Sequence, residues 1–305
     1  MKKIRHIFLL MTFVLGCVFQ SCSKKNLGEN VKVIDCKPEI FIGKIDSKLN
    51  ETSGLIWFDN RLWSMNDGGN KDEIYALDAD GDIRITVELE DAKNNDWEAM
   101  TQDDKYIYVG DFGNNHGIRK DLKVFRISKK KLYDDKEELK VKAKKIKFSY
   151  ALQKNFFPRK HAHQFDCEAM FSYKDHLYLF SKDWATFNTE LYKLPKKPGE
   201  YELNPEGSFK VKGLITGAAL SPDKKYFSLI GYLDSVPFIY LFKFDPANTF
   251  SEKAVFLDLK TIAGSQTEGI CFINDSTLVF STERTSSYSQ KVFSINWSEY
   301  KTFLD

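Results

Sequence analysis

The stretch Ser53-Gly-Leu-Ile-Trp-Phe-Asp-Asn-Arg-Leu-Trp-Ser-Met-Asn66 contains two short apolar strands, a polar turn between them and a polar end. Four later stretches repeat this plan, at residues 98–115, 168–183, 216–232 and 268–284. Short runs rich in aromatic and β-branched residues, separated by Asp, Asn, Gly and Lys-Asp turns, are typical of an all-β protein. Their recurrence indicates a repeat architecture.

Each repeat is followed by further strand-forming sequence. A third strand is expected in every repeat, at residues 73–77, 122–127, 190–194, 238–244 and 291–295, and a fourth strand in the first four only. A spare apolar segment at residues 39–45 can complete the fifth unit. Four-stranded units repeated around an axis form a β-propeller, so the sequence predicts five blades closed by an N-terminal strand.

The second repeat is longer than the others. The repeats start 45, 70, 48 and 52 residues apart, and the extra sequence lies between residues 127 and 166. A hidden unit in this segment would give six blades, which stays the alternative. Its lysine-rich run, residues 139–148, is typical of an outer edge strand that charge protects from pairing with other chains.

The N-terminus predicts export and lipid anchoring. Basic residues precede an apolar run of ten residues, 7–16, which is typical of a signal peptide and too short to span a bilayer. The run is followed by Cys17 and Cys22, and the polar residues after Cys22 resemble the tether of Bacteroidota lipoproteins. We therefore expect a signal peptide at 1–21, lipidation of Cys22 with Cys17 as the alternative, a tether at 22–35 and the propeller at 36–305. The expected location is the outer membrane, on its periplasmic or surface face.

Composition narrows the classes of partner. The chain has 45 Lys and Arg against 43 Asp and Glu, and without the three basic residues of the signal peptide it is nearly neutral. This balance does not indicate nucleic-acid binding. Three further cysteines, Cys36, Cys167 and Cys271, have no CxxC spacing, so we expect them to be buried small apolar residues. The expected partners are the membrane and a small anionic ligand, with the protein a monomer.

One polar residue of each innermost strand falls at the same register position in the five repeats: Ser53, Glu98, Glu168, Thr216 and Glu268. Alternate residues of these strands face the central channel, so three carboxylates and two hydroxyls would face one another. Like charges that close repel and cannot be buried unpaired. Calcium tolerates a loose ring of oxygen ligands, so these residues predict a Ca2+ site. Apolar residues follow two positions later: Leu55, Met100, Met170, Ala218 and Ile270.

More polar residues are expected at the channel mouth beside this ring, because the innermost strands start there and the second strands end there. The carboxylates that could act as a catalytic base are Asp96, Asp166, Asp111 and Asp183. The residues that could bind a ligand are Asn66, Asp67, Asn114, Lys182, Glu283 and Arg284. Such convergence is the default position of a propeller site. His161 and His163 lie in a loop that could cover the mouth.

The anchor residues resemble two propeller families. The order Ser53-Gly54-Leu55, Glu98-Ala99, Glu168-Ala169, Thr216-Gly217 and Glu268-Gly269 is similar to the calcium-ligand ring of the five-bladed calcium-activated nucleotidases (apyrases), with Thr216 in place of a serine. The basic residues that grip phosphates in that family have counterparts only in Lys182 and Arg284. A second resemblance, to the bacterial SdiA-regulated propellers, rests on Glu51-Thr-Ser-Gly-Leu, Asn66-Asp67 and Asp96-Trp-Glu98. It implies the fold without a defined activity.

Two functions remain open from the sequence. The first is calcium-dependent hydrolysis of a phosphoester or phosphoanhydride at the acidic mouth, with a carboxylate such as Asp96 or Asp166 as the base. The alternative is a non-catalytic scaffold of the cell envelope that calcium stabilises and whose loops bind a ligand, protein or glycan.

Overall fold

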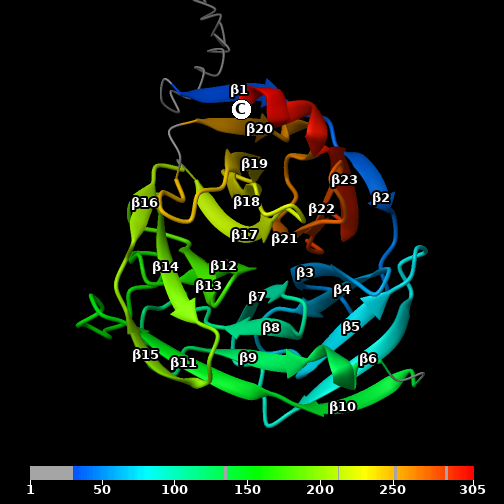
Figure 1. Ribbon diagram of the computed structural model, residues 1–305, viewed down its shortest axis with the longest axis vertical. Coiled ribbons are helices and arrows are strands. Elements are labelled where there is room, and N and C mark those ends of the chain that lie inside the picture. The colour runs from blue at the N-terminus through cyan, green and yellow to red at the C-terminus, as the bar shows by residue number, and fades with distance from the viewer. Residues whose placement is uncertain (1–29, 134–135, 212, 251–252, 286–287) are drawn as a thin grey trace, which may run out of the picture.

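The protein is a five-bladed β-propeller in the computed structural model, which describes residues 30–133, 136–211, 213–250, 253–285 and 288–305. Five sheets of four or five strands surround a central channel (Figure 1). The predicted all-β class and the blade count of five are confirmed. The predicted signal peptide and both candidate lipidation sites, Cys17 and Cys22, lie outside the described residues.

Each blade runs from an innermost strand at the channel to an outermost strand at the rim. Blade 1 has β3 (Thr52–Phe58), β4 (Arg61–Asn66), β5 (Glu73–Leu77), β6 (Ile83–Glu90) and β10 (Glu138–Lys142). Blade 2 has β7 (Trp97–Gln102), β8 (Tyr106–Asp111), β9 (Lys123–Ser128), β11 (Lys144–Tyr150) and β15 (Gly199–Leu203). Blade 3 has β12 (Cys167–Tyr173), β13 (His176–Ser181), β14 (Thr189–Pro195) and β16 (Gly207–Phe209). Blade 4 has β17 (Leu214–Leu220), β18 (Tyr226–Leu233), β19 (Val236–Lys243), β20 (Ala254–Asp258) and β1 (Val31–Asp35). Blade 5 has β21 (Thr267–Phe272), β22 (Thr277–Thr282), β23 (Lys291–Asn296) and β2 (Glu39–Ile42). Short 3-10 helices are η1 (Lys129–Lys131), η2 (Lys260–Ile262) and η3 (Trp297–Phe303).

The N-terminal strand closes the ring, as the spare segment predicted. β2 pairs antiparallel with β23, with Glu39 opposite Ser294 and Ile40 opposite Phe293. Figure 1 shows this closure as a blue strand beside an orange-red one. A second N-terminal strand was not predicted. β1, at the end of the predicted tether, pairs parallel with β20, so the domain starts before residue 36.

The long segment after the second repeat contains no innermost strand, which excludes a sixth blade there. It forms two strands that belong to different blades. β10 pairs parallel with β6 at the edge of blade 1, and β11 pairs with β9 in blade 2. The prediction of one edge strand was therefore wrong in part, because β15 covers β11.

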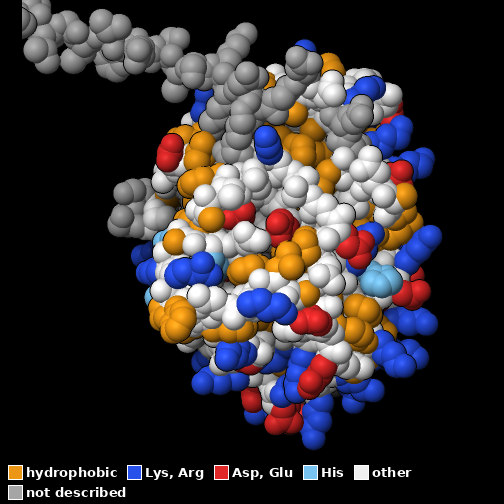
Figure 2. Space-filling view, turned by 90° about the vertical axis from the view of Figure 1, so that its left-hand side faces the viewer, with side chains coloured by type: hydrophobic (Ala, Val, Ile, Leu, Met, Phe, Trp, Pro, Cys, Tyr) orange, Lys and Arg blue, Asp and Glu red, His pale blue; other side chains and the backbone are white. Residues whose placement is uncertain are grey.

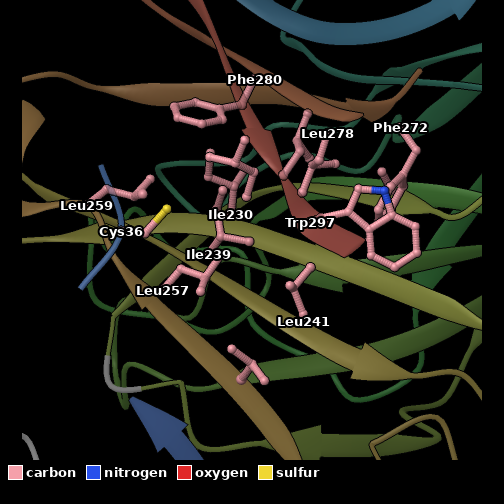
Figure 3. Close-up of a cluster of buried hydrophobic side chains, with 14 of the residues drawn as sticks. Cys36, Ile230, Ile239, Leu241, Leu257, Leu259, Phe272, Leu278, Phe280 and Trp297 are labelled. Carbon is pink, nitrogen blue, oxygen red and sulfur yellow. The ribbon is translucent and has the colours of Figure 1, made fainter. Parts of the chain in front are cut away.

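The blades are held together by apolar side chains at their interfaces. Between blades 4 and 5 a cluster includes Ile230, Leu278 and Phe280, with Trp297 fully buried beside them (Figure 3). Cys36 belongs to this cluster, and Cys167 and Cys271 are also buried free thiols, as predicted. Rigid packing of this kind fixes the innermost strands relative to one another.

The outer surface carries mixed charge. On the side of the molecule in Figure 2, Lys and Arg side chains lie interspersed with Asp and Glu side chains. Some charged side chains of the outer surface form ion pairs, for example Lys147 with Glu200 at 2.7 Å. Among the described residues, no helix is long and apolar enough to cross a bilayer.

Candidate functional site at the channel mouth

All five predicted ring residues lie near the start of innermost strands, and each lies where the pairing of that strand with its neighbour is irregular. The register of the innermost strand shifts across Ser53, Glu98, Glu168, Thr216 and Glu268. A bulge re-aims the side chain of the extra residue. These irregularities recur in all five blades, so the ring is a repeated feature of the fold.

The two hydroxyl residues of the ring join neighbouring blades. Ser53 Oγ donates a hydrogen bond of 2.6 Å to the carbonyl oxygen of Glu98, and Thr216 Oγ1 donates one of 2.6 Å to that of Thr267. Each hydroxyl therefore fixes the spacing of two innermost strands at the level of the carboxylates.

A buried lysine occupies one side of the ring. Lys182 Nζ lies 3.1 Å from Glu168 Oε2, and both side chains are buried. The charges of Glu168 and Glu268 raise the pKa of Lys182 well above its usual value, against the effect of burial. Glu268 also accepts a hydrogen bond of 3.1 Å from Gln266. The ammonium thus balances negative charge inside the ring, where the sequence predicted a calcium ion.

The remaining glutamate of the ring, Glu98, belongs to a separate group of carboxylates. Carboxylate oxygens of Asp67, Asp96 and Glu98 all lie within 4.8 Å of one another, close enough to share a metal ion. Two glycines make room for them. A Cβ on Gly113 would lie 2.2 Å from Glu98 Oε1, and one on Gly68 would lie 2.4 Å from Asp96 Oδ1. Any larger residue at either position would displace these carboxylates.

Burial and mutual repulsion favour the neutral forms of six carboxyl groups at this mouth: Asp67, Asp96, Glu98, Glu168, Glu268 and Glu283. Burial raises the pKa of Asp67 to about 6 and that of Asp96 to about 7, and nearby carboxylates add to the effect for Asp96. Burial also raises the pKa of Glu283 to about 8. The pKa values of the three ring glutamates are raised well above the ordinary value for the same first reason. A divalent cation would remove this cost.

Calcium fits part of the predicted ring. The donor set of Asp67, Asp96 and Glu98 is made of hard oxygen ligands, as calcium requires. Glu168 Oε1 and Glu268 Oε2 are buried without a hydrogen-bond partner, so the lysine side of the ring is only partly satisfied. The five ring residues therefore do not form one equivalent ligand set, because Glu98 shares its group with Asp67 and Asp96 whereas Glu168 pairs with Lys182.

Three of the four predicted catalytic carboxylates are occupied by structural contacts. Asp166 accepts from the Asn114 backbone at 2.6 Å and from Trp184 Nε1 at 2.9 Å, one donor on each oxygen. Asp111 pairs with Arg119 at 2.9 Å and with Lys123 at 2.8 Å. The carboxylate of Asp183 accepts from Ala185 and Thr186 in a turn. These contacts leave Asp96 as the candidate base.

The predicted ligand-binding residues divide between the mouth and its supporting loops. Asp67 and Lys182 lie in the mouth, and Glu283 is buried close enough to interact with both. Asn66 binds the loop before β3 through the Glu51 amide and the Lys48 carbonyl. Asn114 holds the Phe165 carbonyl and the Arg119 amide. Arg284 is exposed at the rim.

A cavity of about 470 Å³ opens beside the carboxylate group. It is lined by Asp96, Asn114, Asn115, His116, Ile118, Arg119, Lys160 and His161. His161 stacks on Trp184 with ring centroids 3.9 Å apart and has a left-handed backbone at φ 54°. That conformation is costly for a residue other than glycine, so the surrounding loop must impose it. His163 is buried, and both its ring nitrogens contact backbone groups, which makes it structural.

The sequence interpretation missed two residues of the mouth that the repeat register could have identified. Gln266 stands two residues before Glu268, as Asp96 stands before Glu98. Tyr232, near the end of β18, stands at the same register position as Lys182, which directly follows β13, and its ring lies 5.8 Å from Lys182 Nζ. Trp184 had no such signal, because it lies in the loop after β13.

The metal-free protein is expected to lose stability between about pH 5 and pH 8. Asp96 and Glu283 have raised pKa values, so between the ordinary and the raised value the folded state binds more protons than the unfolded state. Their contribution is greatest below the ordinary pKa and is lost as the pH rises through the raised one. Thermal melts in chelator at both pH values test this. Glu283→Gln should reduce the difference in Tm between pH 5 and pH 8. If that variant shows the same difference as the wild type, Glu283 does not cause the loss of stability.

Comparison with known proteins places the fold. No protein-family model and no curated protein matches the sequence. A crystal structure of glucose dehydrogenase matches with a TM-score of 0.50 and 10% identity, covering 83% of this chain and 98% of that one. The PQQ-bound aldose sugar dehydrogenase of Streptomyces coelicolor matches with a TM-score of 0.49 and 10% identity, covering 85% of this chain and 98% of that one. The Cps50 (Swd1) β-propeller domain of Myceliophteria thermophila matches with a TM-score of 0.42 and 10% identity, covering 85% of this chain and 99% of that one. Likeness at these identities extends to the fold alone, and the function must be argued from the mouth of this five-bladed propeller.

Proposed function

We propose that the mouth binds a calcium ion through Asp67, Asp96 and Glu98 and that the protein hydrolyses a small phosphoester or phosphoanhydride there. The observation that carries the proposal is that Asp96 belongs both to the acidic group and to the wall of the cavity. Its carboxylate belongs to the acidic group, and the residue also lines the 470 Å³ cavity, together with Lys160 and His161. A metal-ligating group and a basic cavity with a common wall suit an anionic substrate.

The side chains of the cavity have distinct tasks in this proposal. Lys160 supplies positive charge to the substrate. The neutral His161 ring, whose pKa burial and nearby lysines lower, donates a hydrogen bond, and stacking on Trp184 orients it. Asp96, which belongs to the acidic group and also lines the cavity, accepts the proton of the attacking water. When bound, calcium would supply positive charge to the transferring phosphoryl group.

The direct test is an activity screen of the mature protein. Phosphate monoesters, phosphodiesters, nucleotides and lactones are offered with calcium and, separately, with chelator. Phosphate release that requires calcium supports the proposal. Calcium binding without turnover of any phosphorus ester would instead favour the non-catalytic scaffold and overturn the hydrolase.

We also propose that the protein is anchored to the outer membrane through Cys22. The support is the pattern of residues 1–26, an apolar run followed by a cysteine and a polar tether. Cys22→Ser is expected to leave an unprocessed precursor without acyl label, because the lipidated cysteine is the cleavage point. Metabolic labelling with a fatty acid measures this. Normal labelling of that variant, lost instead in Cys17→Ser, would move the anchor to Cys17.

A further inference from the structure

The residue that follows the third strand of a blade occupies a repeated position. Its backbone amide donates to a carbonyl in the turn between the first two strands of the same blade. The four examples are Lys129 to Lys105 at 3.0 Å, Lys196 to Asp175 at 2.9 Å, Phe244 to Lys225 at 2.7 Å and Trp297 to Ser276 at 2.9 Å. Blades 2 to 5 therefore place this residue alike.

The side chains at this position pack against the preceding blade. The Phe244 ring lies 4.8 Å from the ring of Tyr173, and the Trp297 ring lies 5.5 Å from that of Tyr226. Blades 4 and 5 thus use an apolar residue. In blade 3 the position is Lys196, and its ammonium lies 3.0 Å from Asp103. The lysine of blade 3 is neutralised where the other two blades have no charge.

Lys129, in blade 2, has no such carboxylate. The residue is only 8% exposed, and Nζ lies 4.5 Å from the ring centre of Phe58. Among the described residues, no ion pair or side-chain hydrogen bond is formed by this ammonium. Burial lowers the pKa of Lys129, although the charges of Asp103 and Asp104 act in the opposite direction. A buried lysine without an anion is costly, and an apolar residue would serve packing better.

Lys129 lines a cavity of about 900 Å³ that lies among the turns of the blades. The innermost strands end here, so this is the opposite end of the channel from the carboxylates. The apolar layer predicted from the sequence forms its floor, through Leu55, Met100, Ala218 and Ile270. Seven Lys and Arg residues and four Asp residues line it, an excess of positive charge. The volume is in the range of small-molecule sites, and apolar walls with few polar groups are typical of them.

We propose that this cavity binds a small organic anion, whose carboxylate, sulfonate or phosphate group pairs with Lys129 and whose apolar body rests on the floor of the channel. The site is separate from the calcium mouth. It requires neither Asp96 nor metal, so its failure and the failure of the hydrolase can be told apart.

The test uses the aromatic sulfonate 8-anilinonaphthalene-1-sulfonate and the mature protein in chelator. We expect saturable binding of one probe molecule, seen by fluorescence and calorimetry. Lys129→Met should raise its Kd by about tenfold or more, because it removes the charge that pairs with the sulfonate. Lys105→Met is the matched control: it removes an exposed lysine from the same cavity and should change Kd by less than about twofold.

Folding does not confound this comparison. Blades 4 and 5 carry apolar residues at the equivalent position, so Lys129→Met should melt no lower than the wild type. Asp96→Asn should bind the probe like the wild type. Absence of saturable binding to the wild type, or equal Kd values for Lys129→Met and the wild type, would overturn the proposal.

Discussion

Asp96→Asn is expected to abolish calcium-dependent hydrolysis and to remove most of the stabilisation by calcium. The substitution keeps the shape of the side chain and deletes one anionic ligand of a group whose oxygens lie within 4.8 Å. It also deletes the proposed base, and loss of a general base lowers kcat by roughly 10²–10⁴-fold. Calcium at about 100 times its Kd stabilises a fold by about 2.7 kcal/mol, which corresponds to a rise of roughly 5 °C in Tm for a domain of this size.

The matched control is Asp80→Asn, which removes an exposed carboxylate from a turn of the same propeller. It should retain both the calcium response and the activity. Thermal melts with calcium and with chelator, and phosphate release under the same conditions, measure the two effects. If Asp96→Asn keeps the full calcium response, the ion does not bind at Asp67, Asp96 and Glu98. If it loses the calcium response but keeps the activity, hydrolysis requires neither calcium at this group nor Asp96 as the base.

The fold was predictable because the information for it is periodic. A strand–turn–strand plan repeated five times fixes both the blade count and the register, and the register alone placed Glu98, Glu168 and Glu268 around one channel. The position of β2 followed from the same count. Periodicity could not predict how strands outside the repeat pair with the blades. β1 and β15 lie parallel against the outer strands of their blades, and neither has a counterpart in every unit.

The site was predictable only in outline, for a physical reason. Sequence register places side chains at one level of the channel, but their charge balance depends on which ones touch. Lys182 and Asp183 stood together at the end of a strand, yet one enters the ring and the other closes a turn. Asp166 and Asp96 stand at equivalent positions in the sequence. The carboxylate of Asp166, however, accepts a hydrogen bond from Trp184, which lies in a loop. Contacts made by irregular loops decide these roles, and such loops carry little periodic signal.

The lysine in the ring leads to the second large prediction. Lys182→Met is expected to lower the free energy of unfolding by about 3–5 kcal/mol in chelator at pH 8, because Glu168 then keeps a buried charge without its partner. At pH 5 the loss should be smaller, since the raised pKa of Glu168 allows it to take up a proton. Urea denaturation at the two pH values measures both. Lys196→Met, which breaks a more exposed pair with Asp103, should cost less.

The double variant Lys182→Met, Glu168→Gln separates the charge from the shape. It removes both members of the pair and should recover most of the lost stability, because replacement of a whole buried ion pair is often nearly neutral. Calcium should stabilise Lys182→Met more than the wild type, since Glu98, Glu168 and Glu268 would then face the channel without an internal cation. That gain should disappear in the double variant. If Lys182→Met in chelator at pH 8 is as stable as the wild type, the ammonium does not balance the ring, and the three glutamates must be neutral there without it.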